Sequence, residues 1–208
     1  MLMEHVENKI ITIKNKFKSN EKSAFLTVII LGFISHAFSF FNHVFYGDGI
    51  KYTNSLGSSI QSGRWGLEIL FYIRRLIFQN NTIPVINGIL TIILIGFIVV
   101  IILRTLEIEN NILSIILAGL MVSFPVVASL FIYIFTAPAY FLSILLNVFA
   151  IYMFSKNKNI VNFIISVLLI TFSLGIYQAF LGISAALAIL VLIKDIVNSD
   201  KTVKQSSP

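Results

Sequence analysis

A polar interval from Tyr46 to Trp65 holds the residue types of this chain that are best suited to chemistry. It contains the carboxylate of Asp48 and the cations of Lys51 and Arg64, and apolar segments flank it on both sides. A carboxylate can take a proton from an attacking hydroxyl group, and a guanidinium can bind a phosphate through two hydrogen bonds. These residues predict group transfer from a phosphorylated substrate, with Asp48 as the base and Lys51 and Arg64 as phosphate ligands.

Each of these residues also has a simpler interpretation. Asp48 lies between two glycines, so an alternative is that it only ends a helix and initiates a turn, as Asp-Gly often does. Arg64 and Trp65 can equally be residues of a membrane boundary, where tryptophan is enriched. Tyr177 and Gln178 form a polar pair inside an apolar run. That pair suggests contact with a sugar, although packing alone would explain its glycine neighbours.

The composition places these residues in a membrane protein. Of 208 residues 57% are hydrophobic and 12% are charged, with a mean hydropathy of +0.93, whereas about a quarter of a soluble domain is charged. Long apolar runs favour membrane-spanning helices over a barrel of short alternating strands. The sequence therefore predicts an all-α, polytopic helix bundle. The absence of cysteine excludes disulfides, thiolate metal sites and thiol nucleophiles.

Six spans account for the apolar runs. Residues 24–45 and 84–103 are each about as long as the ~20 residues that one crossing requires. Residues 110–155 and 159–193 lack charged side chains, and at ~1.5 Å per residue each is too long for one helix across a ~30 Å core. We expect the first to turn at 136–138, where a proline disfavours helix, and the second at 175–178. Residues 66–78 predict a helix in the membrane interface.

Charge placement predicts the orientation. Residues 1–23 form a cytoplasmic amphipathic segment, residues 24–194 the transmembrane domain with its first outer loop at 46–83, and residues 195–208 a polar cytoplasmic tail that we expect to be disordered. With six spans, eleven of the fifteen Lys and Arg residues lie on the side of both termini, in agreement with the positive-inside bias.

Four further residues have weaker interpretations. Arg74 and Arg75 are expected to contact lipid headgroups. His36 and His43 are seven residues apart and share a helix face, but no carboxylate accompanies them within the span. A hydrogen bond between helices is therefore preferred to a metal site.

An ordered set of short motifs resembles a known family. Residues 47–49 (GDG) are followed by residues 62–66 (SGRWG), 123–125 (SFP), 135–140 (FTAPAY) and 175–179 (GIYQA). Together they are similar to the N-terminal part of the bacterial serotype-converting glucosyltransferases of the Gtr type II kind, over roughly residues 24–194.

The resemblance implies a membrane glycosyltransferase of the GT-C architecture in the bacterial inner (plasma) membrane. Such an enzyme takes a sugar from a polyprenyl-phosphate donor at the outer face and transfers it to a surface polysaccharide such as O-antigen. Asp48 would be the catalytic base, Arg64 a ligand of the donor phosphate, and Trp65, Tyr177 and Gln178 would line the pocket.

No cofactor is required by this interpretation, because Arg64 and Lys51 can neutralise phosphate charge; a divalent metal is not excluded. Nucleic acid is not expected as a partner. Members of the family are longer, so the resemblance also implies a truncated or partial chain, with a separate C-terminal half, a flippase and a sugar synthase as partners.

The alternative function is a non-catalytic one, as a flippase for lipid-linked sugar or an assembly partner. A transporter marks its pathway with polar or charged groups at mid-membrane depth. Every acid, lysine and arginine here falls outside the predicted spans, which favours surface chemistry over transport.

Overall fold

The computed structural model describes residues 17–42, 60–78 and 83–205, with the side chains of Phe78 and of residues 200–205 left undescribed. Within these ranges all regular structure is helical, which confirms the all-α fold class. The helices are α2 (Ser19–Phe41), α4 (Trp65–Phe78), α5 (Pro84–Leu106), α6 (Asn111–Ser123), α7 (Pro125–Phe131), α8 (Ala137–Lys156), α9 (Ile160–Ile176), the short 3₁₀ helix η1 (Gln178–Phe180) and α10 (Leu181–Gln205).

The helices fall where the apolar runs predict them. Among the described residues, α2, α5, α8 and the stretch Gln178–Ser199 are long and apolar enough to cross a membrane. Helices α6 and α7 are bent by 46° and would make a fifth span if taken as one, while α9 is apolar but has only 17 residues. Both expected breaks, before Pro138 and after Ile176, are present.

Proline and asparagine fix several helix starts. Pro84, Pro125 and Pro138 lie in the first turns of α5, α7 and α8, where a missing N–H costs nothing. The side chains of Asn110 and Asn159 cap α6 and α9 by accepting backbone N–H groups at 3.0 and 2.7 Å. The turns of the bundle are therefore encoded locally.

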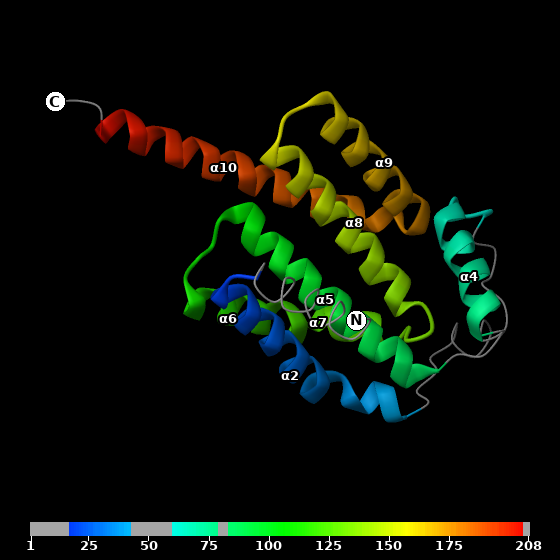
Figure 1. Cartoon of the computed structure of the whole chain (residues 1–208). Helices are drawn as coiled ribbons and strands as arrows, with labels where there is room; N and C mark the ends of the chain where they lie inside the picture. The colour runs from blue at the N-terminus through cyan, green and yellow to red at the C-terminus, as the bar shows by residue number, and fades with distance from the viewer. Residues whose placement is uncertain (1–16, 43–59, 79–82, 206–208) are drawn as a thin grey trace, which may run out of the picture.

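The bundle is built around α5, which packs against α2 on one side and α8 on the other, while α6 covers α2 and α9 covers α8 (Figure 1). Its core is aliphatic and aromatic, with Val28, Ile92, Val99, Phe131 and Val148 almost fully buried. Outward-facing side chains are also apolar, as expected for surfaces that meet lipid.

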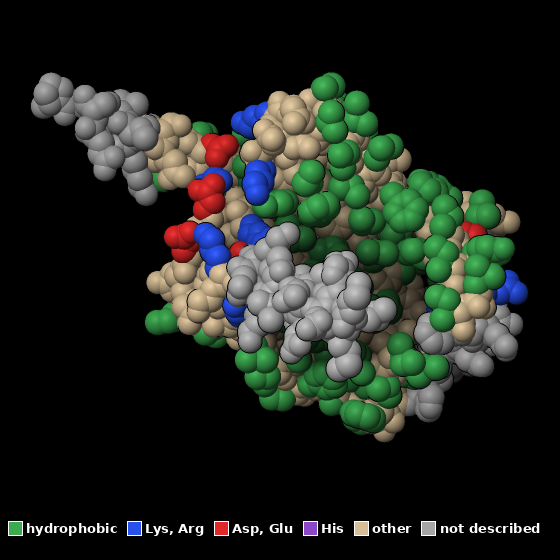
Figure 2. Space-filling model, viewed as in Figure 1, with side chains coloured by type: hydrophobic (Ala, Val, Ile, Leu, Met, Phe, Trp, Pro, Cys, Tyr) green, Lys and Arg blue, Asp and Glu red, His purple; other side chains and the backbone are tan. Residues whose placement is uncertain are grey.

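Successive segments run in opposite directions, so the bundle has two distinct ends. Acidic and basic side chains gather at the end where α2 begins and α5 and α8 stop (Figure 2). Helix α4 lies near the other end, beside the end of α9 (Figure 1). We refer to these as the charged end and the α4 end.

His36 stabilises the bend between α6 and α7. Its Nε2 donates to the Val122 carbonyl at 2.9 Å, and its ring stacks on Phe131 with centroids 4.0 Å apart. Val122 lies in the last turn of α6, where carbonyls lack helical partners. The predicted hydrogen bond between helices is confirmed for His36; His43 lies outside the described residues.

One expectation for the segments beside the transmembrane domain is wrong. The tail after Lys194 was expected to be disordered, but α10 continues to Gln205, because extending an existing helix avoids the cost of nucleation. Helix α2 begins at Ser19, within the segment 1–23 that precedes the predicted span. Its Glu21, assigned to the polar segment, is instead buried in a two-pronged ion pair with Arg104, with N–O distances of 2.8 Å.

Candidate functional site

The fold brings together four of the six residues predicted for the site. Arg64, Trp65, Tyr177 and Gln178 meet at the α4 end, although more than a hundred positions separate the two pairs in the chain. Asp48 and Lys51, the predicted base and second cation, lie outside the described residues. The site can therefore be described only for the SGRWG motif (62–66), the GIYQA motif (175–179) and their neighbours.

Two glycines permit the close approach of α4 to α9. A Cβ added at Gly66 would lie 2.9 Å from the carbonyl carbon of Gly175 and 3.0 Å from the amide nitrogen of Ile176. A Cβ added at Gly175 would lie 2.5 Å from the Trp65 ring. Each motif thus has a glycine where the other motif packs against it, because any side chain there would clash.

An apolar cluster continues this contact along α4. Leu67, Phe71 and Ile176 are at most 6% exposed and form a small core separate from that of the main bundle. The Trp65 ring packs edge-on against Phe172, with centroids 5.6 Å apart, and remains 42% exposed. The first turn of α4 is therefore held firmly while part of the Trp65 side chain stays accessible.

Arg64 lies over the Tyr177 ring, with its guanidinium carbon 4.6 Å from the ring centroid. Its Nε is buried and has no hydrogen-bond partner among the described residues, and no carboxylate there is within ion-pair distance of it. A cation–π contact stabilises a guanidinium by roughly 0.5–2 kcal/mol and leaves its hydrogen-bond donors available. This cation can therefore accept an anionic ligand.

Gln178 joins the two motifs through its side chain. Its Nε2 donates to the carbonyls of Ser62 and Gly63 at 3.4 and 3.3 Å, which are long hydrogen bonds. Gly63 has φ of +75°, a left-handed conformation that favours glycine. The exposed amide of Gln178 can exchange these weak bonds for contacts with a ligand.

Tyr140 is a member of the site that the sequence assigned no role. Its ring lies 4.9 Å from that of Tyr177 and 5.9 Å from that of Phe180. Aromatic faces of this kind stack on the apolar faces of sugar rings or on apolar chains. The sequence signal that could have identified Tyr140 was its place in the FTAPAY motif.

A buried polar network, also missed, holds the turn that carries Tyr177 and Gln178. Asn147 of α8 donates to the Ser173 hydroxyl at 2.6 Å and to the Phe180 carbonyl at 3.2 Å, and accepts from Ser184 at 2.6 Å. Ser143 and Ser173 bond each other at 2.7 Å. All four side chains are at most 4% exposed.

This network is uncharged, and Asn147 is bonded on both sides of its amide. Such groups stabilise helix contacts inside a membrane. They therefore point to a structural role in placing the turn rather than to a pathway for a transported substrate.

Arg74 makes a contact within the protein that the sequence did not predict. Its Nη1 donates to the Phe135 carbonyl at 3.0 Å, so it is directed toward the start of α8, whereas Arg75 is exposed. Burial lowers the pKa of the Arg74 guanidinium, which still remains protonated at neutral pH. Arg74 also lines a groove of about 320 Å³ between α4, α5 and the start of α8, whose wall is otherwise largely apolar.

Metal ligands do not gather in the part of the chain that the structure describes. No group of three or more His, Cys, Asp or Glu side chains there could hold a metal ion. The described half of the site offers the cation of Arg64, the aromatic rings of Trp65 and Tyr177 and the amide of Gln178.

Comparison with known protein families gives a match. The family model described as "Glucosyl transferase GtrII" matches residues 37–207. No curated protein and no solved structure matches. The matched range contains all six predicted site residues and both halves of the described site.

Proposed function

The chain belongs to the GtrII glucosyltransferase family, and from this premise we propose that it transfers a sugar from a polyprenyl-phosphate donor to a cell-surface polysaccharide at the outer face of the bacterial plasma membrane. Family membership and the apolar helices together make the chain a membrane glycosyltransferase. The observation that carries the finer proposal is Arg64, a cation without a carboxylate partner among the described residues, held over Tyr177 at the α4 end.

Arg64 is proposed to bind the phosphate of the donor. During transfer the bond between the anomeric carbon and the phosphate oxygen breaks, and the electron pair leaves with the polyprenyl phosphate. The leaving phosphate thereby gains negative charge, which a fixed guanidinium stabilises more in the transition state than in the bound donor. Lys51 is proposed as a second cation for the same charge.

Asp48 is proposed as the general base. Its carboxylate takes the proton of the acceptor hydroxyl as the hydroxyl oxygen bonds to the anomeric carbon. Helix α2 ends near Asn42, on the same side of the bundle as α4. Asp48 follows Asn42 by six positions in the sequence and falls within the range that the family model matches, which supports the assignment.

Trp65, Tyr177 and Gln178 are proposed to bind the sugar. The partly exposed indole and the tyrosine ring provide flat apolar surfaces for the ring of a hexose, and the Gln178 amide provides a donor and an acceptor for its hydroxyls. The groove beside Arg74 is adjacent to α4, and its apolar wall suits the start of a polyprenyl chain.

The test is sugar transfer from a labelled polyprenyl-phosphate donor by the purified protein in membrane vesicles. Asp48→Asn is expected to abolish transfer. Loss of a general base lowers the rate by roughly 10²-fold at least. Asp195→Asn is the matched control, because Asp195 is a partly exposed acid near the charged end. Transfer by Asp48→Asn at the wild-type rate, with equal accumulation in the membrane, would remove Asp48 from this role.

A further inference from the structure

A second pocket lies at the charged end, away from the residues proposed for sugar transfer. Its volume is about 440 Å³, and it is lined by the first turn of α2, the last turns of α5 and α8, residues 107–109 and Lys194 of α10. This volume is in the range of sites for small ligands. The family assignment and the proposed reaction give it no role.

The pocket has an excess of positive charge. Its lining includes four cations and three carboxylates, and three of the cations are paired. Lys18 pairs with Glu109, Arg104 with Glu21 and Lys194 with Glu107. The remaining cation is Lys156, which has no carboxylate within ion-pair distance among the described residues.

Lys156 is arranged to receive an anion. Its Nζ donates to the Tyr152 hydroxyl at 3.1 Å and lies 5.4 Å from the centroid of the same ring. The Tyr152 hydroxyl, which accepts this bond, keeps its own proton for a further acceptor. An ammonium and a phenol side by side therefore present donors to one oxygen-rich group.

The surroundings indicate a lipid. Lys156 is in the last turn of α8, and Phe149 and Phe154 on the same helix are 36% and 41% exposed. An anion held at Lys156 would thus have apolar helix surface beside it for acyl chains. Basic pockets between helices at the membrane boundary bind anionic headgroups in this way.

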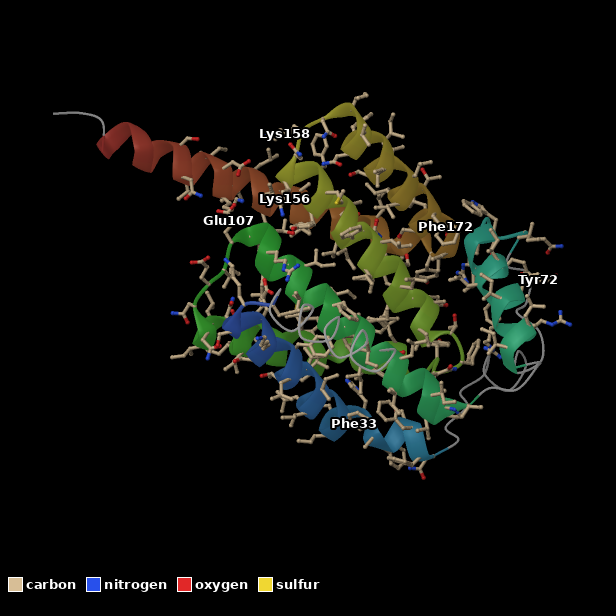
Figure 3. All side chains as sticks on the ribbon, viewed as in Figure 1. Phe33, Tyr72, Glu107, Lys156, Lys158 and Phe172 are labelled. Atoms are coloured by element: carbon tan, nitrogen blue, oxygen red, sulfur yellow. The ribbon has the colours of Figure 1, made fainter. Side chains whose placement is uncertain are left out.

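We propose that this pocket binds the phosphate of an anionic phospholipid through Lys156 and Tyr152. Figure 3 shows Lys156 at the same end of the bundle as Glu107, with Phe172 and Tyr72 at the other end. Bound there, the lipid bridges the last turns of α5 and α8 and the middle of α10. Because the site is remote from Arg64, the proposal does not depend on the proposed reaction.

The test is retention of phospholipid by the purified full chain, measured by native mass spectrometry after titration with phosphatidylglycerol or phosphatidylcholine. Lys156→Gln is expected to weaken phosphatidylglycerol binding about fivefold, the effect of one basic residue near an anionic surface, and Tyr152→Phe is expected to weaken it in the same direction. Lys158→Gln, an exposed lysine two residues on that does not line the pocket, is expected to change nothing.

Three results would overturn the proposal. One is equal loss of phosphatidylglycerol in the Lys156 and Lys158 variants, which indicates a general surface effect. Another is equal retention of phosphatidylcholine and phosphatidylglycerol by the wild-type protein. The third is displacement of phosphatidylglycerol by inorganic phosphate at millimolar concentration, which would identify a free phosphate site instead.

Discussion

The contact between α4 and α9 makes a prediction that can be tested without knowledge of the substrate. In Gly66→Ala, the added methyl group would lie 2.9, 3.0 and 3.1 Å from backbone atoms of Gly175, Ile176 and Phe172. Optimal contacts between carbon atoms are roughly 3.5–4.0 Å. Since no side chain can rotate away, α4 must move outward by about 0.5–1 Å.

The expected cost follows from that displacement. Overpacking of a closely packed contact costs roughly 1–3 kcal/mol, which corresponds to about a 5- to 150-fold change in an equilibrium constant. The buried cluster of Leu67, Phe71 and Ile176 loses contacts at the same time. We therefore expect Gly66→Ala to raise the undocked fraction of α4 by this factor while the main bundle stays folded.

The chain provides its own probe, because Trp65 is its only tryptophan and it packs on Gly175 and Phe172. Acrylamide quenching of its fluorescence is expected to increase in Gly66→Ala. The matched control is Gly182→Ala, because a Cβ added at Gly182 meets no atom within 4 Å. Identical quenching in wild type, Gly66→Ala and Gly182→Ala would refute the close packing of α4 on α9.

Three further predictions concern the site, the network and the charged end. Arg64→Lys is expected to reduce transfer of the labelled sugar by roughly 10-fold or more, because lysine lacks the planar fork that binds phosphate; wild-type transfer would argue against Arg64 as the phosphate ligand. Asn147→Ala is expected to destabilise the protein by about 1–3 kcal/mol in thermal unfolding, because Ser184 and the Phe180 carbonyl lose their hydrogen-bond partner. The control is Asn157→Ala, at an exposed position near the end of α8. Equal melting temperatures of the two variants would contradict the role of the network. Glu21→Gln is expected to lower the free energy of unfolding by about 2–3 kcal/mol. This is less than the ~3–5 kcal/mol of a fully buried pair, because the Arg104 side chain is 34% exposed. A melting temperature equal to that of Glu107→Gln, whose side chain is 66% exposed, would show that burial of the pair contributes nothing.

Much of the fold could be predicted from composition and local pattern. Uncharged runs longer than one crossing must turn back, and Pro138 and Gly175 marked where they do so. Breaks of this kind depend on neighbouring residues only, since proline removes a donor and restricts the residue before it. The ends of helices were harder to predict, because Glu21 becomes helical and buried through Arg104, 83 residues away.

The candidate site was half predictable. Arg64, Trp65, Tyr177 and Gln178 were singled out by their types and motifs, and the family match covers all of them. That Arg64 meets Tyr177 could not be read from the chain, because this contact requires α4 to pack on α9 through Gly66 and Gly175. The roles of Asp48 and Lys51 stay predictions that the transfer assay will decide.

The sequence by itself determined that this chain forms apolar helices in a membrane. The hydropathy and length of each run depend on neighbouring residues only, and they can be compared directly with the thickness of a bilayer. It also identified the family, through short motifs in a fixed order. Only the tertiary structure decided which motifs share a site, that Asn147 holds the turn beside it, and that Lys156 is left without a carboxylate among the described residues. These facts depend on contacts between residues far apart in the chain, which no local pattern records.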